Sequence, residues 1–135
     1  MYDISNSIEN RPSPKHNLKI LVAEDNELNY LLIKTILTKS DYTPIRAKNG
    51  REAIDIMQSD ADIALILMDI QMPEVDGITA ARIIRQFNQK IPIVMQTSYQ
   101  SMMTEATEAG CNEYLTKPLR REVLLGVIGK FTGAA

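Results

Sequence analysis

Short apolar runs alternate with amphipathic stretches along the chain from Leu18 onward. Five runs suit β-strands, and they lie at 18–23, 43–47, 64–69, 91–97 and 113–117. After each run, apolar residues recur at the three- and four-residue spacing of a helix. The residues predicted to share a helical face are, in chain order, Leu28, Leu31, Leu32, Thr35 and Ile36; Ala53, Ile54 and Met57; Ile78, Ala81 and Ile84; Met103, Ala106 and Ala109; and Leu124, Val127, Ile128 and Phe131. The pattern predicts five strand–helix pairs.

The order of these segments indicates an α/β fold. Strands joined through helices can lie parallel, and right-handed crossovers then place helices on both faces of the sheet. The stretches "ALILM" and "IPIVM" are apolar without alternation, so they suit strands that are buried on both faces. We expect a five-stranded parallel sheet, doubly wound by helices, within one domain at 18–135. Residues 1–17 are polar and aperiodic and contain two prolines, which is typical of a flexible tail or an interdomain linker.

Composition narrows the function classes further. The chain has 135 residues, of which 44% are hydrophobic and 24% are charged, as expected for one soluble domain. Its net charge of −2 provides no general attraction for nucleic acid or anionic lipid. No apolar run approaches the roughly 18–20 residues of a membrane span. The single cysteine, Cys111, fits a reducing compartment, so we expect a cytoplasmic protein.

Polar side chains stand where four of the five predicted strands end. Glu24 and Asp25 follow the first strand, and Asp69 ends the third. Thr97 and Lys117 end the fourth and the fifth, whereas the second strand contributes nothing comparable, as expected for an edge strand. In an open parallel sheet, ligands bind beyond the carboxyl ends of the strands. Three carboxylates, a hydroxyl and an ammonium are therefore expected to meet at this carboxyl edge.

This set of groups indicates phosphoryl transfer. Three close carboxylates would raise one another's pKa unless a cation lay among them, and Mg²⁺ prefers such oxygen ligands. Asp69, at the centre of the edge, is the best candidate for the nucleophile that accepts a phosphoryl group. Taken singly, Glu24 and Asp25 could simply lie at a helix start, and Asp69 could be a turn residue before Pro73. Their joint placement favours the functional interpretation.

Four motifs resemble the receiver domains of bacterial two-component response regulators. They are "ILVAEDNELN", "LMDIQMPEVDG", "PIVMQTS" and "AGCNEYLTKP", and they occur in the family's order over residues 18–131. The resemblance implies a flavodoxin-like sheet with strand order 2-1-3-4-5. One departure is that the segment between Thr97 and Tyr114 is two residues shorter than is usual in the family. We expect the missing pair to fall in the fourth helix or the loop before it.

The resemblance also implies the roles of the acidic residues. Asp69 would accept a phosphoryl group from a phosphohistidine on a partner protein. Asp25 and Asp69 would bind Mg²⁺, with Glu24 acting largely through water. The backbone carbonyl of Gln71 would be a further metal ligand.

The remaining site residues follow from the same resemblance. Lys117 and Thr97 would contact the phosphoryl oxygens. Tyr114 would be a switch aromatic that turns inward as Thr97 moves toward the phosphoryl group. The peptide bond before Pro118 is expected to be cis, which costs little ahead of proline.

The sequences of the motifs "EDNELN" and "MDIQMPEVDG" most resemble those of receivers attached to hybrid histidine kinases. The expected partner is a histidine kinase or a histidine phosphotransfer protein, with no nucleic acid or membrane contact by this domain. A weak homodimer on phosphorylation is left open. The domain would catalyse its own phosphorylation and dephosphorylation without being a turnover enzyme, whereas a longer parent chain would be a kinase on the cytoplasmic side of a membrane.

Three alternatives to a receiver of a hybrid histidine kinase are considered. A free-standing single-domain regulator would use the same site. A degenerate receiver would serve for docking alone. A Mg²⁺-dependent phosphohydrolase generally carries a second acid two residues after the nucleophile, and here that position is Gln71, which cannot protonate a leaving group.

Two side positions, Gln71 and Tyr99, are expected to set the lifetime of the acyl phosphate. We predict that the bulky ring of Tyr99 hinders the attacking water, so the Tyr99→Ala variant should lose its phosphoryl group faster. Comparing phosphoryl half-lives of the two proteins tests this, and equal half-lives would count against it.

Overall fold

A computed structural model describes residues 17–133, which form a five-stranded parallel sheet with the strand order β2-β1-β3-β4-β5. The strands are β1 (Lys19–Ala23), β2 (Thr43–Ala47), β3 (Ile63–Asp69), β4 (Ile93–Thr97) and β5 (Glu113–Thr116). The helices are α1 (Glu27–Lys39), α2 (Gly50–Ser59), α3 (Gly77–Phe87), the 3-10 turn η2 (Gln100–Met102), α4 (Met103–Glu108) and α5 (Arg121–Thr132). The predicted fold class and strand order are confirmed. Apart from Asn17, the predicted tail or linker at 1–17 lies outside the described residues.

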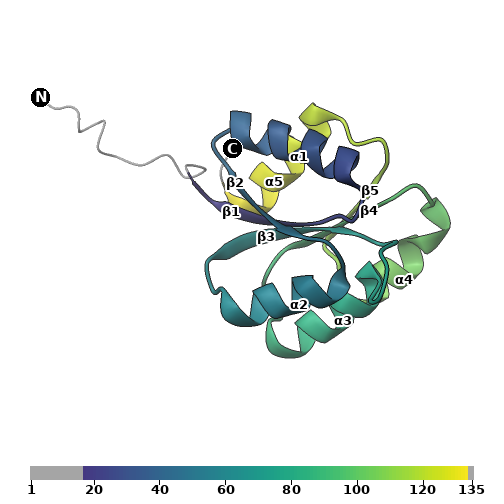
Figure 1. Cartoon of the computed structure of the whole chain (residues 1–135). Coiled ribbons are helices and arrows are strands. Elements are labelled where there is room, and N and C mark those ends of the chain that lie inside the picture. The colour runs from purple at the N-terminus through teal and green to yellow at the C-terminus, as the bar shows by residue number, and fades with distance from the viewer. Residues whose placement is uncertain (1–16, 134–135) are drawn as a thin grey trace, which may run out of the picture.

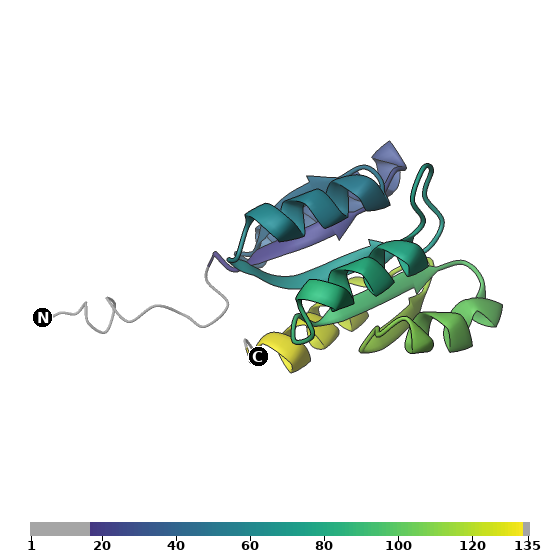
Figure 2. The ribbon, with the colours of Figure 1, turned by 90° about the horizontal axis from the view of Figure 1, so that it is seen from below.

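Helices cover both faces of the sheet, as Figures 1 and 2 show. Helices α1 and α5 pack on one face, over a core that includes Ile20, Val22 and Leu67. Helices α2, α3 and α4 pack on the other face, over a core that includes Leu21 and Ile66. The central strands are therefore buried on both sides, which accounts for their continuously apolar sequence. Of the helices that the structure describes, none combines the length and the apolar character needed for a membrane crossing.

The buried face of α1 differs from the predicted one. Leu28, Leu31 and Leu32 are exposed, with Leu28 at 76% of its full accessibility, and Thr35 is exposed as well. The residues that pack on the sheet are Ile33, Ile36 and Leu37. Both sets have three- and four-residue spacing, so periodicity alone could not separate them. The predicted buried face of this helix was wrong except at Ile36. Leu28, Leu31 and Leu32 instead form an apolar strip on the surface.

The predicted face of α4 needs a smaller correction. Ala106 and Ala109 are buried as expected, but Met103 is exposed, because it stands at the first position of a helix of six residues that follows the turn η2. On α5, Leu124 and Ile128 are buried, and Val127 and Phe131 pack against the same core. The predicted face of α5 is confirmed.

Side-chain caps fix where the helices begin. The side chain of Asn26 accepts a hydrogen bond from the backbone N–H of Asn29, at 2.9 Å, at the start of α1. Asn49 and Asp76 cap α2 and α3 in the same way. Such caps satisfy backbone donors that the first turn leaves unpaired. At α1 the cap also sets the position of Glu24 and Asp25, which lie between the end of β1 and the cap.

Candidate functional site

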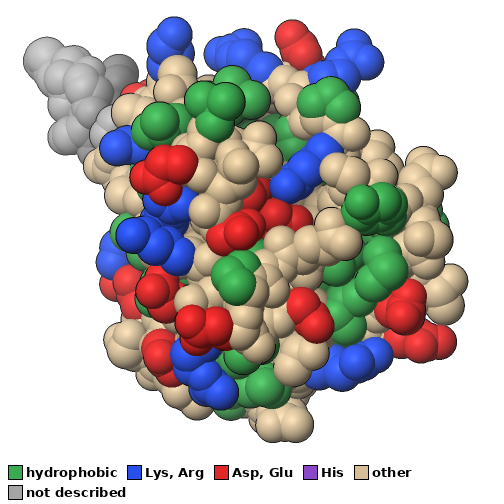
Figure 3. Space-filling view, turned by 45° about the vertical axis from the view of Figure 1, so that its right-hand side comes forward, with side chains coloured by type: hydrophobic (Ala, Val, Ile, Leu, Met, Phe, Trp, Pro, Cys, Tyr) green, Lys and Arg blue, Asp and Glu red, His purple; other side chains and the backbone are tan. Residues whose placement is uncertain are grey.

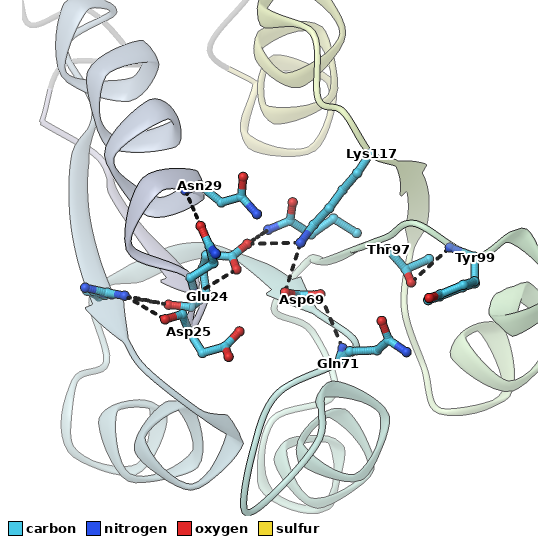
Figure 4. A network of polar contacts seen from close by, with 11 residues as sticks. Glu24, Asp25, Asn29, Asp69, Gln71, Thr97, Tyr99 and Lys117 are labelled. Atoms are coloured by element: carbon cyan, nitrogen blue, oxygen red, sulfur yellow. Dashed lines mark hydrogen bonds and ion pairs between the residues drawn. The ribbon is translucent and has the colours of Figure 1, made fainter.

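An acidic cluster lies at the carboxyl edge of the sheet. Carboxylate oxygens of Glu24, Asp25 and Asp69 all lie within 4.8 Å of one another. Glu24 is 0% exposed and Asp69 is 4% exposed, whereas Asp25 is open to solvent. Figure 4 shows the three side chains around a common space, and Figure 3 shows acidic side chains gathered near the middle of this face. The structure thus brings together the three carboxylates that follow β1 and β3.

Lys117 joins this cluster from the end of β5 (Figure 4). Its Nζ lies 3.0 Å from Asp69 Oδ2 and 3.4 Å from Glu24 Oε1. Burial opposes the charge of the ammonium, but the two carboxylates outweigh burial and raise the pKa of Lys117. The peptide bond between Lys117 and Pro118 is cis, as the resemblance implies.

Glu24 carries negative charge that Lys117 does not fully compensate. Burial, followed by the nearby Asp69 carboxylate, raises the pKa of Glu24 to about 7, even though Lys117 acts in the opposite direction. A cation bound beside Glu24 and Asp69 would favour the charged form of both carboxylates and so lower this pKa. The donor set consists of hard oxygen atoms, so the residues fit a divalent cation such as Mg²⁺.

The buried amide of Gln96 also contacts this cluster. Gln96 Nε2 donates to Glu24 Oε1 at 3.4 Å, and the side chain is 1% exposed. The sequence interpretation missed this residue, although a glutamine inside the apolar run "IPIVMQT" was a signal that could have found it. The other carboxylate oxygen of Glu24 accepts the backbone N–H of Asn26 at 3.2 Å.

The other predicted site residues line the same edge. The backbone N–H of Gln71 donates to Asp69 Oδ1 at 3.2 Å. Thr97 is buried on β4, and its Oγ1 accepts the N–H of Tyr99 at 3.2 Å, as drawn in Figure 4. The hydroxyl of Tyr114 donates to the carbonyl of Tyr99. Residue 99 therefore links Thr97 and Tyr114 through its backbone, while its own side chain is exposed.

The prediction that β2 contributes nothing comparable is wrong. Arg46 on β2 donates from Nη2 to the carbonyl oxygen of Glu24 at 3.0 Å. A charged residue in the short strand "TPIRA" was the available signal. An arginine side chain is long enough to reach the end of the adjacent strand, so an edge strand can still contribute to the site.

The chain belongs to the response regulator receiver domain family, whose model matches residues 20–129. It is therefore a receiver domain of two-component signalling. Fold and site together define this class, because the parallel sheet brings the acidic cluster and Lys117 to its carboxyl edge.

Relatives of two sizes resemble the chain. The hybrid signal transduction protein dokA of Dictyostelium discoideum is 43% identical over 104 residues, which is 75% of this chain but 6% of dokA. The chemotaxis protein CheY of Bacillus subtilis is 34% identical over 115 residues, which is 83% of this chain and 95% of CheY. The chain thus spans a small part of a large hybrid protein and nearly the whole of a small regulator.

Two solved structures show the same fold at similar identity. The receiver domain of the sensor histidine kinase PA1611 from Pseudomonas aeruginosa has a TM-score of 0.82 and 30% identity, covers 87% of this chain and 98% of its own, and holds a magnesium ion in its active-site cleft. The receiver domain of Ssk1 from Saccharomyces cerevisiae, solved with the histidine phosphotransfer protein Ypd1, has a TM-score of 0.81 and 32% identity, covering 89% of this chain and 93% of that chain.

Proposed function

We propose that Asp69 accepts a phosphoryl group from a phosphohistidine of a partner protein in a Mg²⁺-dependent reaction. The observation that carries this proposal is the Asp69 carboxylate, nearly buried at the end of β3, with Lys117 Nζ 3.0 Å from one oxygen and two further carboxylates beside it. The magnesium ion in the receiver of PA1611 supports the choice of metal. The receiver solved with Ypd1 supports the kind of partner.

The roles proposed for the residues combine their positions at this edge with the resemblance to receiver domains. An oxygen of Asp69 forms a bond to phosphorus, the bond from phosphorus to the histidine nitrogen breaks, and that nitrogen keeps the electron pair. Lys117 neutralises charge on the phosphoryl oxygens, and the hydroxyl of Thr97 donates to one of them. Asp25, Asp69 and the carbonyl of Gln71 would hold the metal, and Glu24 would assist through water. When bound, the metal offsets the negative charge of the carboxylates and of the phosphoryl oxygens.

Acetyl phosphate and beryllofluoride, each with Mg²⁺, test this proposal. The wild-type chain should become modified, and the Asp69→Asn variant should not. Steady turnover of phosphate esters would instead indicate a phosphohydrolase. No response of the wild-type chain to either reagent would indicate a receiver that serves for docking alone.

We further propose that the chain is a piece of a hybrid sensor histidine kinase, with the receiver at 18–135. Relatives such as dokA, of which the chain covers 6%, support this architecture. Similarity to nearly the whole of CheY supports the alternative, a free-standing regulator. The sequence of the full-length gene product decides between the two.

Mg²⁺ should stabilise the protein more at about pH 8 than at about pH 5.5. The pKa of Glu24 is raised from 4.5 to about 7, so the metal-free folded state holds a proton that the unfolded state releases. The free energy of unfolding without metal should therefore fall by at most about 2 kcal/mol as pH rises from about 5.5 to about 8. Urea unfolding at both pH values, with and without Mg²⁺, measures the effect. The Glu24→Gln variant should lose the metal-free pH dependence, and an unchanged dependence would contradict the assignment.

The apolar strip on α1, formed by Leu28, Leu31 and Leu32, is the proposed contact for a histidine phosphotransfer protein. All three side chains are exposed, and a cavity of about 340 Å³ lined by both Leu32 and Lys117 connects the strip to the site. Exposed apolar patches of this kind mark interaction surfaces. The strip therefore lies where a partner could approach Asp69.

Replacing all three leucines of this strip with serine should slow transfer from a phosphorylated histidine phosphotransfer protein by about 10-fold or more. Phosphorylation by acetyl phosphate should stay unchanged, because the small donor needs no docking surface. Val123→Ser on α5, also an exposed apolar position, serves as the matched control and should leave both rates unchanged. Equal slowing with both donors would mean that the leucines support the site and not the partner.

A further inference from the structure

We infer that Arg46 is a positioning residue that holds the backbone of Glu24 and Asp25 in the arrangement that binds metal. This inference rests on the proposed function of the site. Arg46 lies within β2, paired with Val22 of β1, and the exposed fraction of its side chain is 14%. Its guanidinium reaches past the end of β1 to the residues that follow it.

The guanidinium contacts the carbonyl oxygens of both acidic residues. Its Nε and Nη2 donate to the carbonyl of Glu24, at 3.2 and 3.0 Å, and Nη2 also lies 3.4 Å from the carbonyl of Asp25. The N–H of Glu24 donates to the carbonyl of Ala47, the next residue of β2, at 3.0 Å. The edge strand β2 thus holds the N–H and the C=O of Glu24 and reaches the C=O of Asp25.

Two contacts with α1 hold the guanidinium itself in place. Its Nη1 donates to Glu27 Oε1 at 2.7 Å, and its Cζ lies 4.5 Å from the centre of the Tyr30 ring. A planar guanidinium with several fixed donors can serve carbonyls, a carboxylate and an aromatic face together, whereas a lysine ammonium cannot reproduce that geometry.

This backbone contact matters most for Asp25. Among the residues that the structure describes, its carboxylate has no hydrogen-bonding partner or ion pair, although it belongs to the acidic cluster. The position of that carboxylate therefore depends on the backbone that carries it. Glu24 differs, because Lys117, Gln96 and the N–H of Asn26 also hold its side chain. Loss of Arg46 should weaken metal binding mainly by freeing Asp25.

Titration of metal-free protein with Mg²⁺ in a calorimeter tests this inference. Arg46→Gln and Arg46→Lys should each weaken Mg²⁺ binding by about 10-fold or more, as is typical when a partner of a metal ligand is removed. Glu27→Gln is the matched control, because it removes the charge of the ion pair with Arg46, while the amide oxygen of glutamine can still accept the hydrogen bond from Nη1 and so keep the guanidinium on the two carbonyls. Its Mg²⁺ affinity should stay within about twofold of wild type. Arg46→Lys keeps the charge, so a purely electrostatic role would be rescued by it.

Backbone amide NMR of the metal-free variants provides a second readout. In Arg46→Lys, the amide resonances of residues 24–26 should shift while those of β3 and β4 stay in place, which also verifies that the variant is folded. Wild-type affinity in both Arg46 variants, or equal weakening in Glu27→Gln, would overturn the inference alone. Failure of the wild-type protein to bind Mg²⁺ would overturn the proposed function and this inference with it.

Discussion

The Lys117→Met variant is expected to be phosphorylated by acetyl phosphate about 100-fold more slowly than wild type, or slower still, while it continues to bind Mg²⁺. Lys117 Nζ lies 3.0 Å from Asp69 Oδ2, where it can meet the phosphoryl oxygens as negative charge develops on them. The same ammonium competes with a metal ion for the carboxylates of Glu24 and Asp69. Removing it should therefore leave Mg²⁺ affinity equal to or tighter than that of wild type, because less positive charge repels the ion.

The rate of phosphorylation and the Mg²⁺ affinity, measured on the same samples, test whether the variant loses the first and keeps the second. Lys130→Met is the matched control, because Lys130 is an exposed lysine of α5 that pairs with Glu113 at 3.2 Å, outside the acidic cluster. That variant should match wild type in both measurements. A Lys117→Met rate within about threefold of wild type would contradict the role given to the ammonium.

The second large effect is expected from Gly77, the first residue of α3. A Cβ at this position would lie 2.2 Å from the carbonyl oxygen of Asp69, a backbone atom that cannot move without shifting the end of β3. Gly77→Ala should therefore lower the free energy of unfolding by about 1–3 kcal/mol and the melting temperature by several degrees. Because the displaced backbone carries Asp69, phosphorylation by acetyl phosphate should also slow.

Gly126 in α5 offers a matched control for that substitution. A Cβ added at Gly126 would have no heavy atom of the described residues within 4 Å, apart from its chain neighbours and the backbone of its own helix. In a helix interior, alanine is more favourable than glycine, so Gly126→Ala should raise the free energy of unfolding by about 0.5–1 kcal/mol. Thermal unfolding of the two variants should therefore change in opposite directions. Equal melting temperatures for Gly77→Ala and wild type would contradict the close contact at Asp69.

Much of the fold was predictable because the chain alternates between two periodicities. Continuously apolar runs such as "ALILM" favour strands that are buried on both faces of a parallel sheet. The polar residues that end such strands then lie at the same edge of the sheet. The acidic cluster and Lys117 could be anticipated from that rule alone. The strand order came from the family resemblance, since periodicity does not specify which strands are neighbours.

What escaped prediction depends on contacts across the sheet. On α1, the predicted apolar face that begins at Leu28 and the buried face that begins at Ile33 have the same helical spacing. Packing on the sheet decides that the face with Ile33 is the buried one. Arg46 and Gln96 act on Glu24 from other strands, at sequence separations of 22 and 72 residues. Their charge and polarity were visible, but their partner was not, because it depends on the register of neighbouring strands.

Tandem mass spectrometry of the protein after treatment with acetyl phosphate and Mg²⁺ is the most direct test of Asp69 as the phosphoryl acceptor. We predict a single phosphoryl group, located on Asp69 and absent when Mg²⁺ is withheld. A phosphoryl group on any other residue, or modification that proceeds equally well without the metal, would contradict it.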